Sequence, residues 1–119
     1  MIRSKIIITV LFLLYLCSLP TLALAKGKRH FTLENSQYGT RLVKWEGKDS
    51  VVDFNNIQEL KDVKVIGEMA FEMNKYIKQV ILPDNLLIIE KRAFNTCENL
   101  QTVKMPNTVR YIGNSAFNM

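Results

Sequence analysis

Few residues in this chain are of types that could carry out chemistry, and their spacing limits what they could do. The single histidine, His30, lies just after an apolar leader, and of the two cysteines only Cys97 lies beyond that leader. A Ser-His-acid or Cys-His arrangement needs its groups within hydrogen-bond reach, which a histidine in a polar arm does not provide. A metal site needs several clustered ligands, and the sequence has no such cluster. We therefore predict no enzyme activity, no metal and no cofactor.

The other conspicuous residues also favour a structural interpretation. Gly67 and Gly113 are not followed by the glycines and lysine of a phosphate loop. Cys97 stands beside apolar positions, which favours a buried and inert thiol over a reactive one. Trp45 and Tyr38 could form an exposed binding pair, but packing at the end of a core is the favoured interpretation. No basic stripe with interleaved aromatic residues is present, so nucleic acid is not an expected partner.

The chain is organised by an internal repeat with a 23-residue period. The dipeptide Ala-Phe occurs at 70–71, 93–94 and 116–117, and an isoleucine precedes each alanine at the same distance. Apolar positions that recur in phase at this interval are typical of a solenoid built from stacked units. We predict that Phe71, Phe94 and Phe117 stack as one aromatic column.

Within a unit, each class of position has a structural role. Val80 and Leu82 are two positions apart and so share the inner face of a short strand. Pro83 ends that strand because proline cannot donate the next ladder hydrogen bond. A second extended piece follows at 86–89, and the stretch before each Ala-Phe reads as a tight helical turn. The predicted fold class is therefore an α/β repeat solenoid with short strands and tight helical turns.

The N-terminus predicts export. Residues 1–25 have a charged start, an apolar run and a small-residue end at Ala23-Leu24-Ala25, the order found in a cleaved signal peptide. The alternative is an uncleaved membrane anchor, because 6–25 is long enough to span a bilayer. Residues 26–37 read as a flexible arm, and residues 38–119 as the repeat domain.

The first part of that domain, 38–65, reads as a degenerate capping unit, and 66–119 as repeats of which the last is incomplete. Two β-prone runs, 42–45 and 51–54, flank a turn-like stretch at 46–50, so a β-hairpin-like N-terminal cap is expected. Subtracting one period places Val43, Phe54 and Ile57 in register with Ile66, Ile77 and Val80 of the first full unit.

The same subtraction predicts rows of outward strand residues. They form a candidate protein-binding face comprising Asn56, Gln79 and Thr102 in one row and Gln58, Ile81 and Lys104 in the next. Solenoids present such rows as an extended surface. Ile81 is the informative member, because an apolar residue on a solvent-facing strand position favours a covered surface.

These residues carry a family resemblance. The pattern Ile77-x-x-Val80-x-Leu82-Pro83-x-x-Leu86-x-x-Ile89-x-x-x-Ala93-Phe94-x-x-Cys97 resembles the BspA-like leucine-rich repeat of bacterial surface proteins. Two positions depart from it: Asn74 stands where Cys97 would recur, and Glu90 replaces the glycine that follows the isoleucine. The resemblance implies a secreted or surface-exposed leucine-rich repeat module that binds proteins, including adhesion to host matrix or to other cells.

An alternative is a structural remnant, or a truncated N-terminal part of a longer repeat protein, without a partner of its own. The expected partner is an unidentified protein, with self-association through the C-terminal end as a further option. Contact with a membrane is expected only if the leader is retained.

Overall fold

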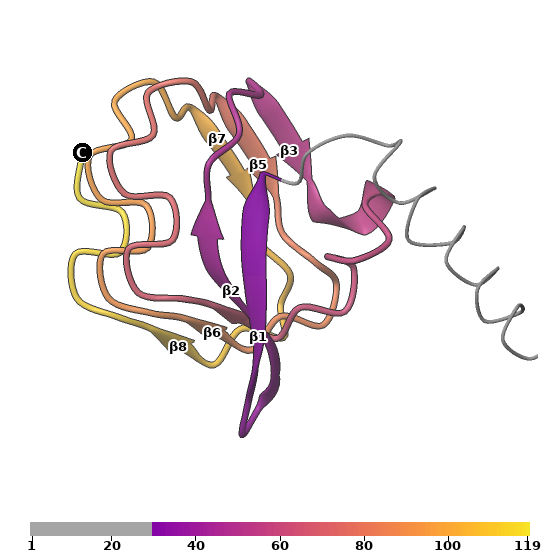
Figure 1. The fold of residues 1–119 in the computed structure, drawn as a ribbon. Coiled ribbons are helices and arrows are strands. Elements are labelled where there is room, and N and C mark those ends of the chain that lie inside the picture. The colour runs from indigo at the N-terminus through magenta and orange to yellow at the C-terminus, as the bar shows by residue number, and fades with distance from the viewer. Residues whose placement is uncertain (1–29) are drawn as a thin grey trace, which may run out of the picture.

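A computed structural model describes residues 30–119, which wind into a short coil (Figure 1). The predicted signal peptide and the first residues of the predicted arm lie outside the described part. The elements are β1 (Phe31–Ser36), β2 (Gly39–Trp45), β3 (Val51–Asp53), η1 (Phe54–Asn56), β4 (Val65–Ile66), β5 (Gln79–Ile81), β6 (Ile88–Ile89), β7 (Thr102–Lys104) and β8 (Tyr111–Ile112). No helix within residues 30–119 is long and apolar enough to cross a bilayer.

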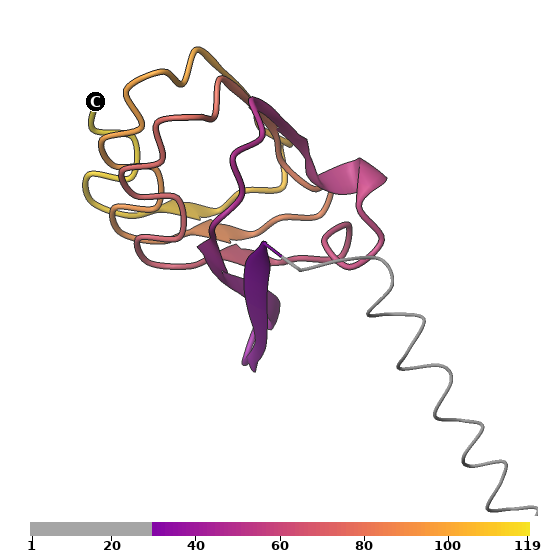
Figure 2. The same ribbon diagram turned by 45° about the horizontal axis from the view of Figure 1, so that its top comes forward.

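The strands form two sheets on two sides of the coil. One sheet has the order β1-β2-β4-β6-β8 and the other β3-β5-β7, and every pair except β1 with β2 is parallel. Gln79 pairs with Thr102 and Ile88 with Tyr111, each one repeat period apart. Figure 2 shows the successive turns lying one above another. The structure is thus the predicted repeat solenoid.

A column of stacked aromatic rings runs through the hydrophobic core from turn to turn. The ring centroids of Phe71 and Phe94 are 4.7 Å apart and those of Phe94 and Phe117 are 5.1 Å apart, with nearly parallel planes. Trp45 and Phe31 extend the column at its N-terminal end, each step measuring 5.8 Å. The predicted Phe column is therefore confirmed, and it is two rings longer than the repeat indicated.

The third side of the coil, which we call the turn side, is built from hydrogen-bonded turns. The tight helical turns expected there are not seen, since η1 is the only helix within residues 30–119. Met69, Arg92 and Ser115, which lie one repeat period apart, have positive φ values of 58°, 56° and 57°, and Met73 and Thr96 have positive values of 63° and 57°. A residue in the left-handed conformation interrupts a helix, and alternate backbone amides then point along the coil axis toward the neighbouring turn.

Those amides link each turn to the next one in a single direction. The amides of Met69 and Phe71 donate to Lys91 O and Ala93 O, and one turn later the amide of Phe94 donates to Ala116 O. Side chains add a parallel ladder: Asn118 Nδ2 donates to Asn95 Oδ1, and Asn95 Nδ2 donates to Glu72 Oε1. All three sides of the coil are therefore hydrogen-bonded between turns.

The N-terminal cap is a hairpin, but it uses other strands than predicted. β1 pairs antiparallel with β2 around a turn at 37–38, so Phe31–Ser36 is a strand and not part of a flexible arm. The expected partners, 42–45 and 51–54, lie in different sheets, because the stretch at 46–50 carries the chain round a corner of the coil. Phe31 lies on Trp45 and Leu33 also packs against the core, which explains why this segment is ordered.

The first unit is longer than the later ones, so the subtraction of one period fails there. Val51 pairs with Gln79 and Leu42 pairs with Ile66, and both separations exceed the repeat period. The additional residues include η1 and the loop that follows it, where Leu60 and Val63 are fully buried. The predicted register equivalences of the first unit, which involved Val43, Phe54 and Ile57, are accordingly wrong.

Candidate protein-binding face

The three-stranded sheet carries the outward rows that the sequence predicts, with one correction. Gln79 lies beside Thr102, and Ile81 beside Lys104. The next members of these rows are Val51 and Asp53, whereas Asn56 ends η1 and Gln58 lies in the loop beyond it. The longer first unit therefore removes Asn56 and Gln58 from the sheet.

The row that contains Ile81 borders a shallow hollow of about 220 Å³. The hollow is lined by Ile81, Leu82, Asp84, Lys104, Met105 and Pro106. Lys104 and Met105 are exposed, and Ile81 is partly exposed. Apolar side chains thus meet a lysine and a carboxylate at the point where β5 and β7 end.

The thiol of Cys97 is buried and faces no open site. Its Sγ donates to Phe71 O at 3.1 Å, and desolvation raises its pKa to about 11. One turn earlier, the side-chain amide of Asn74 makes a comparable hydrogen bond to the preceding turn, because its Nδ2 donates to Gly47 O. Its Oδ1 accepts from the backbone amides of Tyr76 and Ile77. Asn74 therefore preserves the link between turns where the repeat has cysteine.

Trp45 and Tyr38 lie in separate environments. The Trp45 indole is buried in the aromatic column, and its Nε1 is a buried nitrogen without a hydrogen-bond partner among the described residues. Tyr38 lies at the exposed tip of the hairpin, where its amide donates to Ser36 Oγ. The two residues do not form a binding pair.

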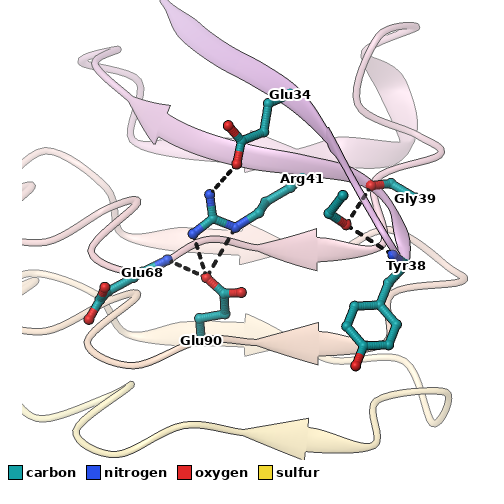
Figure 3. Close-up of polar contacts among 7 residues, drawn as sticks. Glu34, Tyr38, Gly39, Arg41, Glu68 and Glu90 are labelled. Carbon is teal, nitrogen blue, oxygen red and sulfur yellow. Dashed lines mark hydrogen bonds and ion pairs between the residues drawn. The ribbon is translucent and has the colours of Figure 1, made fainter.

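A charged cluster fixes the hairpin to the body of the coil (Figure 3). Arg41 donates to Glu34 Oε2 at 2.6 Å and, through Nε and a terminal nitrogen, to Glu90 Oε1 at 3.1 and 2.6 Å. Glu90 Oε1 also accepts from the Glu68 amide. The hydrogen bond to Glu90 is the largest cause that raises the pKa of Arg41.

This cluster explains the glutamate that departs from the repeat. A Cβ on Gly67 would lie 3.2 Å from the Arg41 guanidinium carbon and 2.5 Å from Leu42 O. Glycine at 67 therefore leaves room for Arg41 to lie across the second turn and reach Glu90 in the third. The sequence shows the substitution at 90 but not its partner, because Arg41 and Glu90 are two turns apart in the chain.

Residues 30–119 contain no group of three or more His, Cys, Asp or Glu side chains that could hold a metal ion. His30 is exposed just before β1, and its carbonyl accepts from the Glu46 amide.

The fold is that of a leucine-rich repeat solenoid. Its repeats stack at a period of one turn, its two sheets are largely parallel, and each repeat places one phenylalanine in the stack. The family described as BspA type Leucine rich repeat region (6 copies) matches residues 49–119. The chain belongs to this family. Modules of this class generally bind proteins and are typically scaffolds rather than enzymes.

A solved structure supports the same assignment. The chain is similar to the T. pallidum leucine-rich repeat protein TpLRR, with 25% sequence identity and a TM-score of 0.68 over 75% of this chain. The chain spans 42% of the length of that protein. Comparison with curated proteins found no match.

Proposed function

We propose that this protein is a secreted or cell-surface module that binds another protein through the outward rows of β3, β5 and β7. The observation that carries the proposal is the hollow beside Ile81, where an apolar side chain is partly open to solvent on a rigid parallel sheet. Binding energy at protein interfaces concentrates in side chains that become desolvated near the centre of the contact. Export is supported by the order of residues 1–25, and adhesion to host matrix or to other cells by the family resemblance.

The proposed contact residues are those of the corrected rows. Gln79, Ile81, Thr102 and Lys104 remain from the prediction, and Val51 and Asp53 replace Asn56 and Gln58. Asp53, Ile81 and Lys104 form one row with a carboxylate at one end and an ammonium at the other. Such a row would orient a partner by charge while the hollow accepts an apolar side chain.

A capture experiment tests this face. The tagged protein is incubated with extracts of host matrix and of neighbouring-cell surfaces, and bound proteins are identified and then tested for direct binding. Ile81→Glu and Lys104→Glu should each abolish the direct binding, because the first places a charge in the hollow and the second reverses the charge beside it. Met73→Glu is the matched control, since Met73 is 70% exposed on the turn side. Binding that survives both face variants would refute the assignment.

The alternative, a structural part of a longer repeat array without a partner of its own, is supported by the coverage of the solved structure. That protein is more than twice as long as the segment matched here. Reading the genomic sequence beyond codon 119 for continued Ile-x-x-x-Ala-Phe at the same period separates the two hypotheses. Sedimentation at micromolar concentration tests self-association, which a clean monomer would exclude.

A further inference from the structure

Two lysines lie around one tyrosine ring at the corner between the turn side and the three-stranded sheet. Lys48 Nζ is 5.7 Å and Lys75 Nζ is 5.8 Å from the centroid of the Tyr76 ring. Both distances fall within the range of a cation–π interaction. The two ammonium groups therefore lie near the same ring, although they come from two successive turns of the coil.

A third lysine belongs to the same corner. The Lys78 amide donates to Ser50 O at 2.7 Å, which joins the loop containing Lys48 to the segment containing Tyr76. Lys78 is exposed, as are Lys48 and Lys75. Asn99 Nδ2 donates to Lys75 O at 2.7 Å and fixes the backbone from the following turn. We call Lys48, Lys75, Lys78 and Tyr76 the lysine corner.

Within residues 30–119, some basic residues form ion pairs with carboxylates, whereas others, including the lysines of the corner, do not. Arg41, Lys91 and Arg92 each form an ion pair with a glutamate. Within residues 30–119, no carboxylate lies within ion-pair distance of the corner lysines, although Asp49 is next to Lys48 in the chain. The corner thus keeps three positive charges available to an external anion.

The geometry points to a polyanionic polysaccharide, carrying sulfate or carboxylate groups along its chain, as the ligand of the lysine corner. This site adjoins the Gln79 end of the protein-binding face but contains none of the proposed contact residues of that face. Ammonium groups on flexible stems can donate hydrogen bonds to oxyanions in many directions, which suits a ligand with repeated charges and no fixed planar geometry. Nucleic acid fits less well, because lysine ammonium groups already lie over the Tyr76 ring on which a base would stack.

Heparin is the probe that tests the proposal. The purified protein should be retained on immobilised heparin, elute with added salt, and bind soluble heparin in a titration. Combining Lys48→Ala, Lys75→Ala and Lys78→Ala should weaken the affinity at least tenfold, because fewer counterions are then released from the polyanion on binding. Tyr76→Phe keeps the ring and should bind as the unchanged protein does, whereas Tyr76→Leu should bind more weakly.

A matched control separates this site from a general effect of charge. Combining Lys61→Ala, Lys91→Ala and Arg110→Ala removes the same net charge from exposed positions elsewhere and should change heparin affinity much less. Equal weakening by the two triple variants, absent heparin binding, or unchanged binding by the corner variant would each overturn the proposal. Equal affinity for duplex DNA would overturn the assignment to polysaccharide. Ile81→Glu should leave heparin binding intact, so this test is independent of the protein-binding face.

Discussion

Replacing Phe94 by alanine tests whether the aromatic column holds the coil together. Phe94 is fully buried, and its ring lies 4.7 Å from Phe71 and 5.1 Å from Phe117. Truncating a buried phenylalanine costs about 3–5 kcal/mol of unfolding free energy. A domain of this size has a total stability in the lower part of roughly 5–15 kcal/mol. Phe94→Ala should therefore leave the protein only marginally folded.

Urea titration followed by the fluorescence of Trp45 measures this effect, because Trp45 is the only tryptophan and lies in the column. A loss of about 4 kcal/mol, at a urea dependence of about 1–2 kcal/mol/M, lowers the midpoint by about 2–4 M. Far-UV circular dichroism should follow the same transition, since the coil folds as one unit.

Phe117→Ala is the matched control. Phe117 is only partly buried and has one ring neighbour among the described residues, so its truncation should cost less than half as much as that of Phe94. Equal costs for the two variants would refute the reasoning, because position in the stack would then not matter. A cost below about 1 kcal/mol for Phe94→Ala would do the same.

Three further perturbations follow from the structure. Glu90→Gln should cost about 1 kcal/mol, because the pair with Arg41 is partly exposed, and the cost should shrink at high salt in the same urea assay. Gly113→Ala should lower the melting temperature, because the added Cβ would lie 2.5 Å from the Lys91 amide nitrogen and push the two turns apart. The expected loss of unfolding free energy is about 1–3 kcal/mol. Cys97 should resist a thiol reagent at about pH 8, below its raised pKa, until urea unfolds the protein. The pKa of the Cys97 thiol is raised from 9.0 to about 11 in the folded state, so the buried group favours its protonated form. The stability that the protonated thiol contributes is therefore fully present below pH 9.0 and is lost as the pH rises toward 11.

The inner turns could be predicted because each of them has the same side-chain packing requirement. Phe71 and Phe94 must each fill the same space one turn apart, so the sequence repeats at the interval of the coil. The Ala before each of them is small because neighbouring turns approach closely there, and Ala70 and Ala93 are indeed fully buried. Repetition of a packing requirement is what made the period visible.

The first turn could not be predicted in detail because its packing requirement differs. Its ring is Trp45, which precedes Phe71 by more than one repeat period, and the loop after η1 inserts residues that the later turns lack. Apolar Phe31 and Leu33 alternate along β1 and could have indicated a strand, but they lie in an otherwise polar stretch.

The charged sites escaped prediction for another reason. The Arg41–Glu90 pair and the lysine corner each join residues from different turns of the coil. Which residues meet depends on the number of residues in each turn, so neither site leaves a local pattern in the sequence. The substitution of Glu90 for glycine was the one local signal, since a carboxylate at a position of close approach requires a nearby cation.

The one-way hydrogen bonds of the turn side also give the coil an electrical polarity. Amides of Trp45, Phe71 and Phe94 all donate toward the higher-numbered turn, and within the described turn at 91–97 no backbone amide donates to a lower-numbered turn. The dipoles of these peptide groups therefore add, as they do in a helix, and each further turn adds to the row of aligned dipoles. The turn side is thus relatively positive toward its C-terminal end and negative toward the hairpin, a field that a side-chain charge count does not reveal.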